Sequence, residues 1–181
     1  VNVNNKPTID VTAADVCPNT AAVLTVGNAN NGDITWPAGT YDASGKTWTS
    51  GSNQTSTTSY DVTATLNGKC PVTKTITVGM KSEPTAEILV NNKATNGAAI
   101  DWCPNTSVDL MVSPTNGTGI TTIVWKNLGK TSHQITETPT ASQTYTATIT
   151  GSNGCTSDIS QIINLYPASQ VTISGNQTVC P

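Results

Sequence analysis

The sequence predicts an all-β protein made of tandem Greek-key β-sandwiches, and three observations lead to that prediction. The tetrapeptide CPNT begins at Cys17, recurs at Cys103, and starts again at Cys180. Apolar and polar residues alternate along several segments, which is the period of half-buried strands. No window of the sequence has the periodicity of an amphipathic helix.

The CPNT tetrapeptide belongs to a longer internal repeat. Three further pairs recur with similar spacing: Trp36 with Trp125, Tyr60 with Tyr145, and Cys70 with Cys155. Self-similarity of this kind indicates one structural unit used in series. We therefore predict a first repeat over residues 1–80, a second over 81–166, and the first strand of a third over 167–181. A proline opens each of them: Pro7, Pro84 and Pro167.

The strands of each repeat follow from its apolar patterns. The runs AAVLTV and SVDLMV predict an early strand, and DITW and TTIVW predict short strands that end at Trp36 and Trp125. The alternating segments TSYDVTATL and QTYTATIT predict long strands, and an Asn-Gly turn follows each of them before VTKTITV and SDISQIINL return as hairpin partners. We expect about seven short strands in each repeat, which is the number typical of a Greek-key sandwich.

The aromatic residues supply the predicted cores. Four of them occupy matching positions in the two repeats and are expected to be buried: Trp36, Trp125, Tyr60 and Tyr145. Trp48 and Trp102 have no counterpart, so we expect them to be freer to lie at the surface. Trp102 precedes Cys103, and we favour a linker or interface role for it over ligand binding.

Composition excludes several function classes. Only 10% of residues are charged and the net charge is −3, so no basic stripe is available for nucleic acid. The sequence contains no apolar run of about 18 residues, the length that a membrane-spanning helix needs. Five cysteines in an acidic, Thr-rich chain fit an oxidising, extracellular compartment. The segment VNVNNKPTID lacks the features of a signal peptide, so we expect a piece of a longer secreted chain.

No catalytic or metal-binding motif is present in the sequence. His133 is the single histidine and lies in the polar segment KTSHQITE, so we predict no enzyme activity. The sequence lacks the loop of alternating Asp and Asn residues with a closing Glu that marks a calcium site. We therefore predict no metal and no cofactor. The alternative is a calcium ion at a domain junction, held by Asp15, Asp101 and Glu87.

The chain resembles a known family of repeats. CPNT leads into an apolar strand, then Trp, then TPTASQTYTATITGSNGC from Thr138 to Cys155. This pattern resembles the immunoglobulin-like repeats, near in fold to PKD domains, of giant surface adhesins of gliding bacteria. The resemblance covers both full repeats and implies type IX secretion, the outer cell surface and an adhesin or stalk role. The first repeat departs from the pattern between Gly39 and Thr58, where it lacks a counterpart of Pro139.

Two disulfide schemes are open. One bridge per repeat would pair Cys17 with Cys70, and Cys103 with Cys155. In an immunoglobulin-like sandwich, however, the start of the second strand and the last hairpin lie at opposite ends, and a six-residue strand spans about 20 Å. Disulfide-linked Cα atoms lie within about 7 Å. In a head-to-tail array the exit end of one domain abuts the next, so we favour Cys17 with Cys155.

The same rule assigns partners to the remaining cysteines. Cys103 would bond the hairpin cysteine of a third repeat, and Cys70 would bond a repeat that precedes residue 1. Cys180 has no partner in this chain under either scheme. A bridge at every junction, acting together with the linker, predicts a stiff rod of sandwiches.

Two functions from different classes follow. The first is a stalk segment of a bacterial cell-surface adhesin whose partners are neighbouring repeats of the same chain, while other regions contact a surface polysaccharide or substratum. The second is a carbohydrate-binding or spacer module of a secreted polysaccharide-degrading enzyme. Exposed Trp or Tyr gathered on one face of a single domain would favour the second, and a fixed register of Cys, Trp and Tyr through the repeats favours the first.

Overall fold

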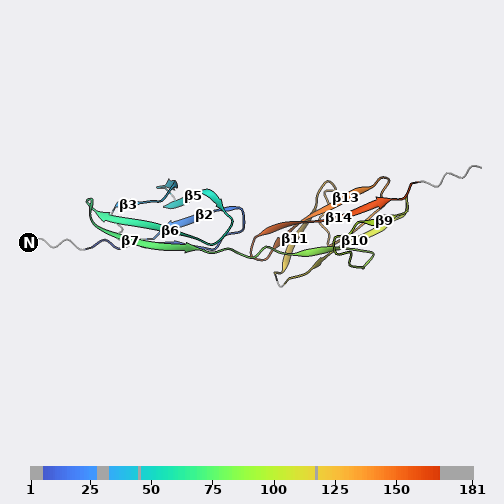
Figure 1. The fold of residues 1–181 in the computed structure, drawn as a ribbon, viewed down its shortest axis with the longest axis horizontal. Helices are drawn as coiled ribbons and strands as arrows, with labels where there is room; N and C mark the ends of the chain where they lie inside the picture. The colour runs from blue at the N-terminus through green and yellow to red at the C-terminus, as the bar shows by residue number, and fades with distance from the viewer. Residues whose placement is uncertain (1–5, 28–32, 45, 117, 168–181) are drawn as a thin grey trace, which may run out of the picture. The chain divides into compact units, whose positions relative to one another are not determined.

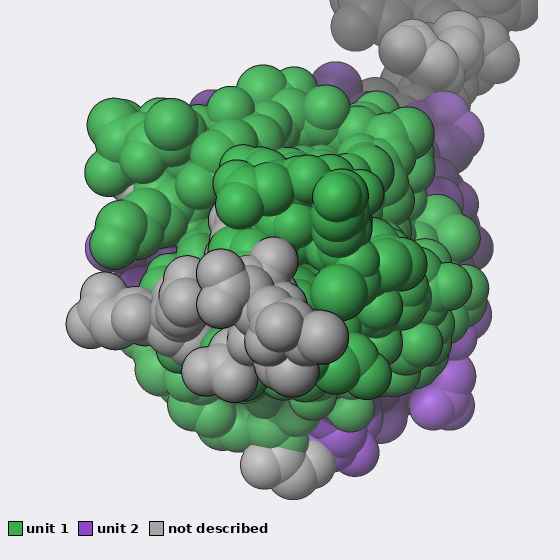
Figure 2. Space-filling view, turned by 90° about the vertical axis from the view of Figure 1, so that its left-hand side faces the viewer, with its two compact units in different colours: residues 1–84, 118–121, 150–157 green, residues 85–117, 122–149, 158–181 purple. Residues whose placement is uncertain are grey.

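The computed structural model describes residues 6–27, 33–44, 46–116 and 118–167, and these residues form strands, turns and loops without a helix. The predicted all-β fold is therefore confirmed. The chain divides into two compact units (Figures 1 and 2): residues 1–84, 118–121 and 150–157 form unit 1, and residues 85–117, 122–149 and 158–181 form unit 2. The boundaries 1–80, 81–166 and 167–181 stay predictions, and Cys180 lies outside the described residues.

The first seven strands form two antiparallel sheets (Figure 1). One sheet has the order β1-β2-β5-β4, with bounds Val11–Ala13, Thr20–Val26, Thr47–Gln54 and Gly39–Asp42. The other has the order β3-β6-β7, with bounds Asp33–Thr35, Thr58–Leu66 and Lys69–Val78. With the strands lettered A to G in chain order, these sheets read ABED and CFG, which is the order of a constant-type immunoglobulin domain.

The next seven strands repeat this plan with two changes: the counterpart of β4 is missing, and one short strand is added to the sheet that corresponds to β3-β6-β7. One sheet has the order β12-β10-β8, with bounds Gln134–Glu137, Val108–Pro114 and Ala86–Val90. The other has the order β11-β13-β14-β9, with bounds Ile120–Trp125, Gln143–Gly151, Thr156–Leu165 and Ile100–Trp102. β9 runs parallel to β14, with Ile100 opposite Ile163. The segment that opens this sandwich, from β8 to β9, therefore crosses from one sheet to the other.

The core of the first sandwich is centred on Trp48, and here the prediction from sequence was wrong. Trp48 is 0% exposed. Its indole Nε1 donates a hydrogen bond to the Pro37 carbonyl at 3.2 Å. Trp36 and Tyr60 are only partly buried and pack against Trp48, with ring centroids 6.3 and 5.0 Å away. Because β5 lies between two strands of its sheet, its inward side chain reaches the centre of the sandwich.

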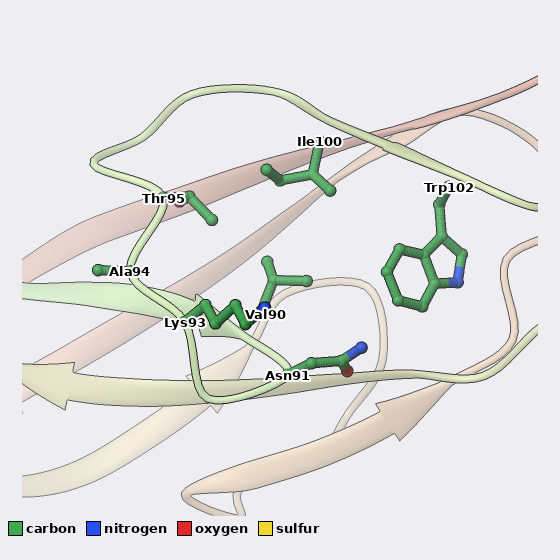
Figure 3. Close-up of a pocket in the computed structure, with 7 residues that line it drawn as sticks. All are labelled: Val90, Asn91, Lys93, Ala94, Thr95, Ile100 and Trp102. Atoms are coloured by element: carbon green, nitrogen blue, oxygen red, sulfur yellow. The ribbon is translucent and has the colours of Figure 1, made fainter.

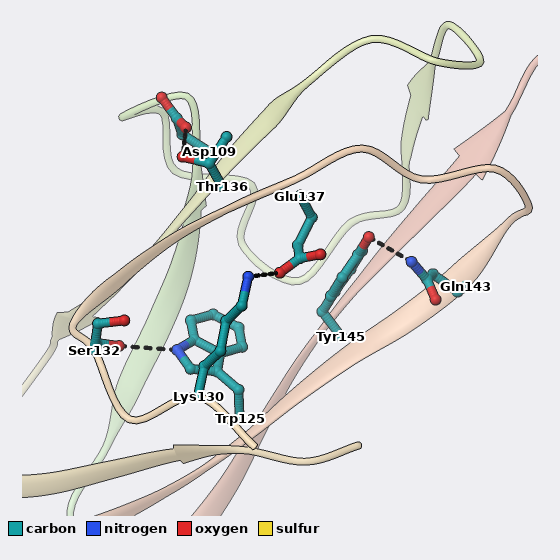
Figure 4. A network of polar contacts seen from close by, with 8 residues as sticks. All are labelled: Asp109, Trp125, Lys130, Ser132, Thr136, Glu137, Gln143 and Tyr145. Atoms are coloured by element: carbon teal, nitrogen blue, oxygen red, sulfur yellow. Dashed lines mark hydrogen bonds and ion pairs between the residues drawn. The ribbon is translucent and has the colours of Figure 1, made fainter. Parts of the chain in front are cut away.

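The core of the second sandwich contains Trp125 and Tyr145, both buried. The Trp125 indole donates to the Ser132 carbonyl at 3.0 Å, and Gln143 donates to the Tyr145 hydroxyl (Figure 4). Burial raises the pKa of the Tyr145 phenol, because the charged form would lose its hydration. Each buried polar group of these rings therefore has a partner.

Candidate functional site

The described residues contain one disulfide, between Cys17 and Cys155, the pair that the sequence favours. The Cα atoms lie 5.4 Å apart, and 138 positions separate the two residues in the sequence. Cys70 and Cys103 are free thiols, so the bridges within single repeats are not formed. A covalent bond thus joins a residue of the first sequence repeat to a residue of the second.

Cys17 lies in a turn that we call the first hook, residues 15–20. The hook is fixed to the segment that follows β7, because Val16 and Met80 form a parallel bridge. The Val16 amide donates to the Gly79 carbonyl at 3.1 Å, and the Gly79 amide donates to the Asp15 carboxylate at 3.0 Å. These contacts place the thiol where the chain leaves the first sandwich.

The CPNT sequence closes the hook locally. Asn19 adopts a positive φ of 58°, a conformation that asparagine tolerates better than most residues. The Thr20 hydroxyl then donates to the Cys17 carbonyl at 2.6 Å. The Asn19 amide donates to the Gln54 carbonyl of β5 at 2.8 Å. Asn19 and Thr20, the two residues that follow the proline in CPNT, therefore both have a structural role in the turn.

Cys155 lies in the turn between β13 and β14, which we call the second hairpin, residues 151–155. The Gly151 amide donates to the Cys155 carbonyl at 2.8 Å, and the Cys155 amide donates to the Asn153 side chain at 3.1 Å. Gly154 has a φ of 84°, which only glycine adopts without strain. Cys155 is 1% exposed.

The second hairpin also binds the segment that follows the first sandwich. The Lys81 ammonium donates to the Asn153 carbonyl at 3.1 Å, and the Asn153 amide group donates to the Ser82 carbonyl at 2.7 Å. The Ser157 hydroxyl donates to the Pro84 carbonyl. All of these residues belong to unit 1. Three hydrogen bonds therefore supplement the disulfide, and sequence reasoning missed them because Asn153 and Ser157 read only as turn and strand residues.

A second hook, residues 101–106, reproduces the first. Asn105 has a φ of 57°, and the Thr106 hydroxyl donates to the Cys103 carbonyl at 2.7 Å. The Tyr166 amide donates to the Trp102 carbonyl at 3.0 Å, as the Lys81 amide donates to the Val16 carbonyl at 2.8 Å. The Cys103 thiol is exposed.

A first hairpin, residues 66–70, joins β6 to β7 through the predicted Asn67-Gly68 turn, whose φ values are 50° and 69°. Both values are positive, as a type I′ turn requires. Cys70 follows this turn at the start of β7 and is exposed. The described residues therefore contain two hooks and two hairpins that carry a cysteine, and one hook and one hairpin are joined.

A pocket of about 280 Å³ lies beside the second hook (Figure 3). Its lining residues are Val90, Asn91, Lys93, Ala94, Thr95, Ile100 and Trp102. The Trp102 indole is partly buried and donates to the Thr106 carbonyl at 3.2 Å. Trp102 thus braces the second hook from the wall of the pocket.

The other candidate residues do not gather into a site. Within the described residues, no three His, Cys, Asp or Glu side chains form a group that could hold a metal ion. Asp15 accepts the Gly79 amide, and Asp101 accepts from Asn164 at 3.4 Å. His133 is exposed. In the part of the chain that the structure describes, no helix is long and apolar enough to cross a membrane.

No protein-family model and no curated protein matches the chain. Among solved structures, it is similar to the fibronectin(III)-like modules of Clostridium thermocellum CbhA, at 8% identity and a TM-score of 0.34, covering 91% of this chain and 100% of that one. It is similar to the titin Ig tandem A164-A165, at 14% identity and a TM-score of 0.30, covering 88% and 96%. It is also similar to the four N-terminal Ig domains of Dscam1 isoform 7.44, at 9% identity and a TM-score of 0.36. That match covers 90% of this chain and 45% of the other. The immunoglobulin-like fold rests on the strand order itself.

Proposed function

We propose that this chain is a segment of the stalk of a long bacterial cell-surface adhesin of the gliding-motility type, exported by the type IX route. Its role is mechanical, its partners are neighbouring repeats of the same chain, and it catalyses no reaction. The observation that carries the proposal is the disulfide between Cys17 of the first predicted repeat and Cys155 of the second. Disulfides persist in extracellular compartments, which agrees with a surface location.

The disulfide defines a covalent path for tension. Force that enters at Cys17 passes directly to Cys155, so the chain between them, a sequence separation of 138, is excluded from stretching. A fully extended chain of that length spans about 470 Å at about 3.4 Å per residue. A stalk that must transmit force without lengthening benefits from this bypass, because every described strand except β1 and β14 lies inside the closed loop.

Single-molecule stretching of the chain from its two ends tests this role. The oxidised chain is expected to release only the residues outside the closed loop, whereas the double variant C17S/C155S is expected to release about 470 Å more. The matched control is C70S/C103S, which keeps the disulfide and should stretch like the parent chain. Equal extension of the parent chain and C17S/C155S would contradict a load path through the disulfide.

A second candidate, a carbohydrate-binding module, is supported by one observation. Trp36 and Tyr41 stack with ring centroids 5.1 Å apart, and Tyr41 is 43% exposed, so unit 1 presents an aromatic face of the kind that sugar rings pack against. Calorimetric titration with soluble β-glucan and xylan tests it. Binding that Tyr41→Ala abolishes and Tyr166→Ala preserves would favour the module over the stalk.

A further inference from the structure

The second hook and the first hairpin are the two halves of a linkage that this chain already forms once. The first hook and the second hairpin are joined by Cys17 and Cys155. The second hook has the same turn as the first: the same positive φ at its asparagine, and the same threonine hydroxyl on the cysteine carbonyl. Its cysteine is presented from the same place in its sandwich, beside the end of the last strand.

The surface around Cys103 is exposed, whereas Cys17 is bonded to the hairpin that carries Cys155. Cys103 is exposed, Trp102 is partly exposed, and Tyr166 is 55% exposed and hydrogen-bonded through its amide to the Trp102 carbonyl. A free thiol thus lies beside one exposed and one partly exposed aromatic side chain, and aromatic residues are enriched in protein contact surfaces. At the first hook, by comparison, Cys155 covers the bonded sulfur and is 1% exposed.

We propose that Cys103 and Cys70 are complementary docking sites, and that each binds a further copy of the immunoglobulin-like repeat through a hook-to-hairpin disulfide. This inference rests on the array part of the proposed function and names its partner. The occupant of the Cys103 hook is a repeat with a hairpin cysteine like Cys70, and this chain itself carries one. Two molecules of the chain can therefore join head to tail, and the open ends continue the series.

The linkage is an oxidation that needs a disulfide oxidant. The thiolate of Cys103 attacks oxidised glutathione and releases one reduced glutathione, forming a mixed disulfide. The Cys70 thiolate of the other molecule then attacks the Cys103 sulfur and releases the second reduced glutathione. Two thiols are oxidised, and one molecule of oxidised glutathione is reduced to two of reduced glutathione.

Two single-thiol variants test the proposal. C70S/C180S keeps only the Cys103 thiol, and C103S/C180S keeps only the Cys70 thiol, while both keep Cys17 and Cys155. The two proteins, equal in concentration and distinguishable by mass, are mixed in a glutathione redox buffer, and the dimers are counted by mass spectrometry without reduction. Accidental collision would give the heterodimer and the two homodimers in a ratio of about 2:1:1.

Complementary sites predict that the heterodimer exceeds either homodimer by about tenfold or more, which about 1.4 kcal/mol of contact energy suffices to produce. The rate at which each thiol reacts with a small aromatic disulfide reports on the intrinsic reactivity and accessibility of that thiol, without a partner surface, and serves as the control. A statistical mixture of dimers, an excess of homodimers, or no dimer at equilibrium would overturn the proposal. None of these outcomes changes the stretching of the Cys17–Cys155 loop, so the two proposals fail separately.

Discussion

At the scale of single residues, the aromatic side chains show where a sequence pattern predicts burial correctly and where it fails. The matching positions of Trp125 and Tyr145 correctly indicated buried rings. The same matching misplaced Trp48, because it gives priority to residues that recur and Trp48 does not. Burial depends on which strand of the sheet carries a side chain, and the polar sequences of β4 and β5 have no clear apolar alternation to reveal that.

Replacing Trp48 by Ala is expected to lower the free energy of unfolding by about 3–5 kcal/mol, the usual cost of deleting a buried aromatic side chain. The control Trp36→Ala should cost less, since Trp36 is only partly buried. Guanidinium unfolding followed by circular dichroism, with the disulfide intact, measures both. A larger loss for Trp36→Ala would contradict the placement of Trp48 at the core.

The Asp158 carboxylate is expected to make the stability of the folded chain depend on pH. The Lys126 ammonium and the Thr148 hydroxyl donate hydrogen bonds to it and lower its pKa from the ordinary value of 3.8. Because the folded-state pKa lies below the unfolded one, the stabilisation is present above pH 3.8 and is lost as the pH falls through the folded-state pKa.

Thermal melting of the parent chain and of Asp158→Asn between pH 6 and pH 2 checks this sign. Asp158→Asn should melt slightly lower than the parent chain at pH 6 and equally at the lowest pH. The difference is expected to be small, because both partners are about half exposed. Lys126→Met should give the same convergence. A difference that grows towards low pH would contradict the account.

At the scale of elements, the long strands could be predicted from the sequence, and the short strands β1 and β9 could not. The alternation in residues 58–66 and 143–151 and the Asn67-Gly68 turn led directly to β6, β13 and the first hairpin. The crossing of the opening segment between sheets was not visible, because three-residue strands such as β1 and β9 are too short to show a period. That crossing places each hook beside the last strand of its sandwich.

Gly79→Ala tests how the first hook is held. An added Cβ would lie 2.4 Å from the Asp15 carboxylate oxygen, so Asp15 must turn away and lose its hydrogen bond to residue 79. The loss of about 1 kcal/mol predicts that the reduced chain re-forms the Cys17–Cys155 bond about fivefold less favourably in a glutathione buffer. Gly51→Ala, whose nearest contact is 3.9 Å, is the matched control and should behave like the parent chain.

At the scale of the whole molecule, the sequence repeat predicted the disulfide partner because spacing and fold geometry act together. A cysteine at the start of the second strand and a cysteine in the last hairpin are too far apart within one sandwich, which left a neighbour as the partner. The hydrogen bonds of Asn153 and Ser157 to residues 82 and 84 depend on side-chain orientation, so no pattern of residue types could predict them.

Peptide mapping of the unreduced protein tests the central claim most directly. Cleavage after lysine and before aspartate isolates Cys17 in residues 15–32, Cys155 in residues 131–157 and Cys70 in residues 70–74. The same digestion releases Cys180 separately from Cys155, because it cuts before Asp158. We predict a disulfide-linked pair of peptides 15–32 and 131–157. A linked pair of peptides 15–32 and 70–74 would contradict the connection between repeats on which the account depends.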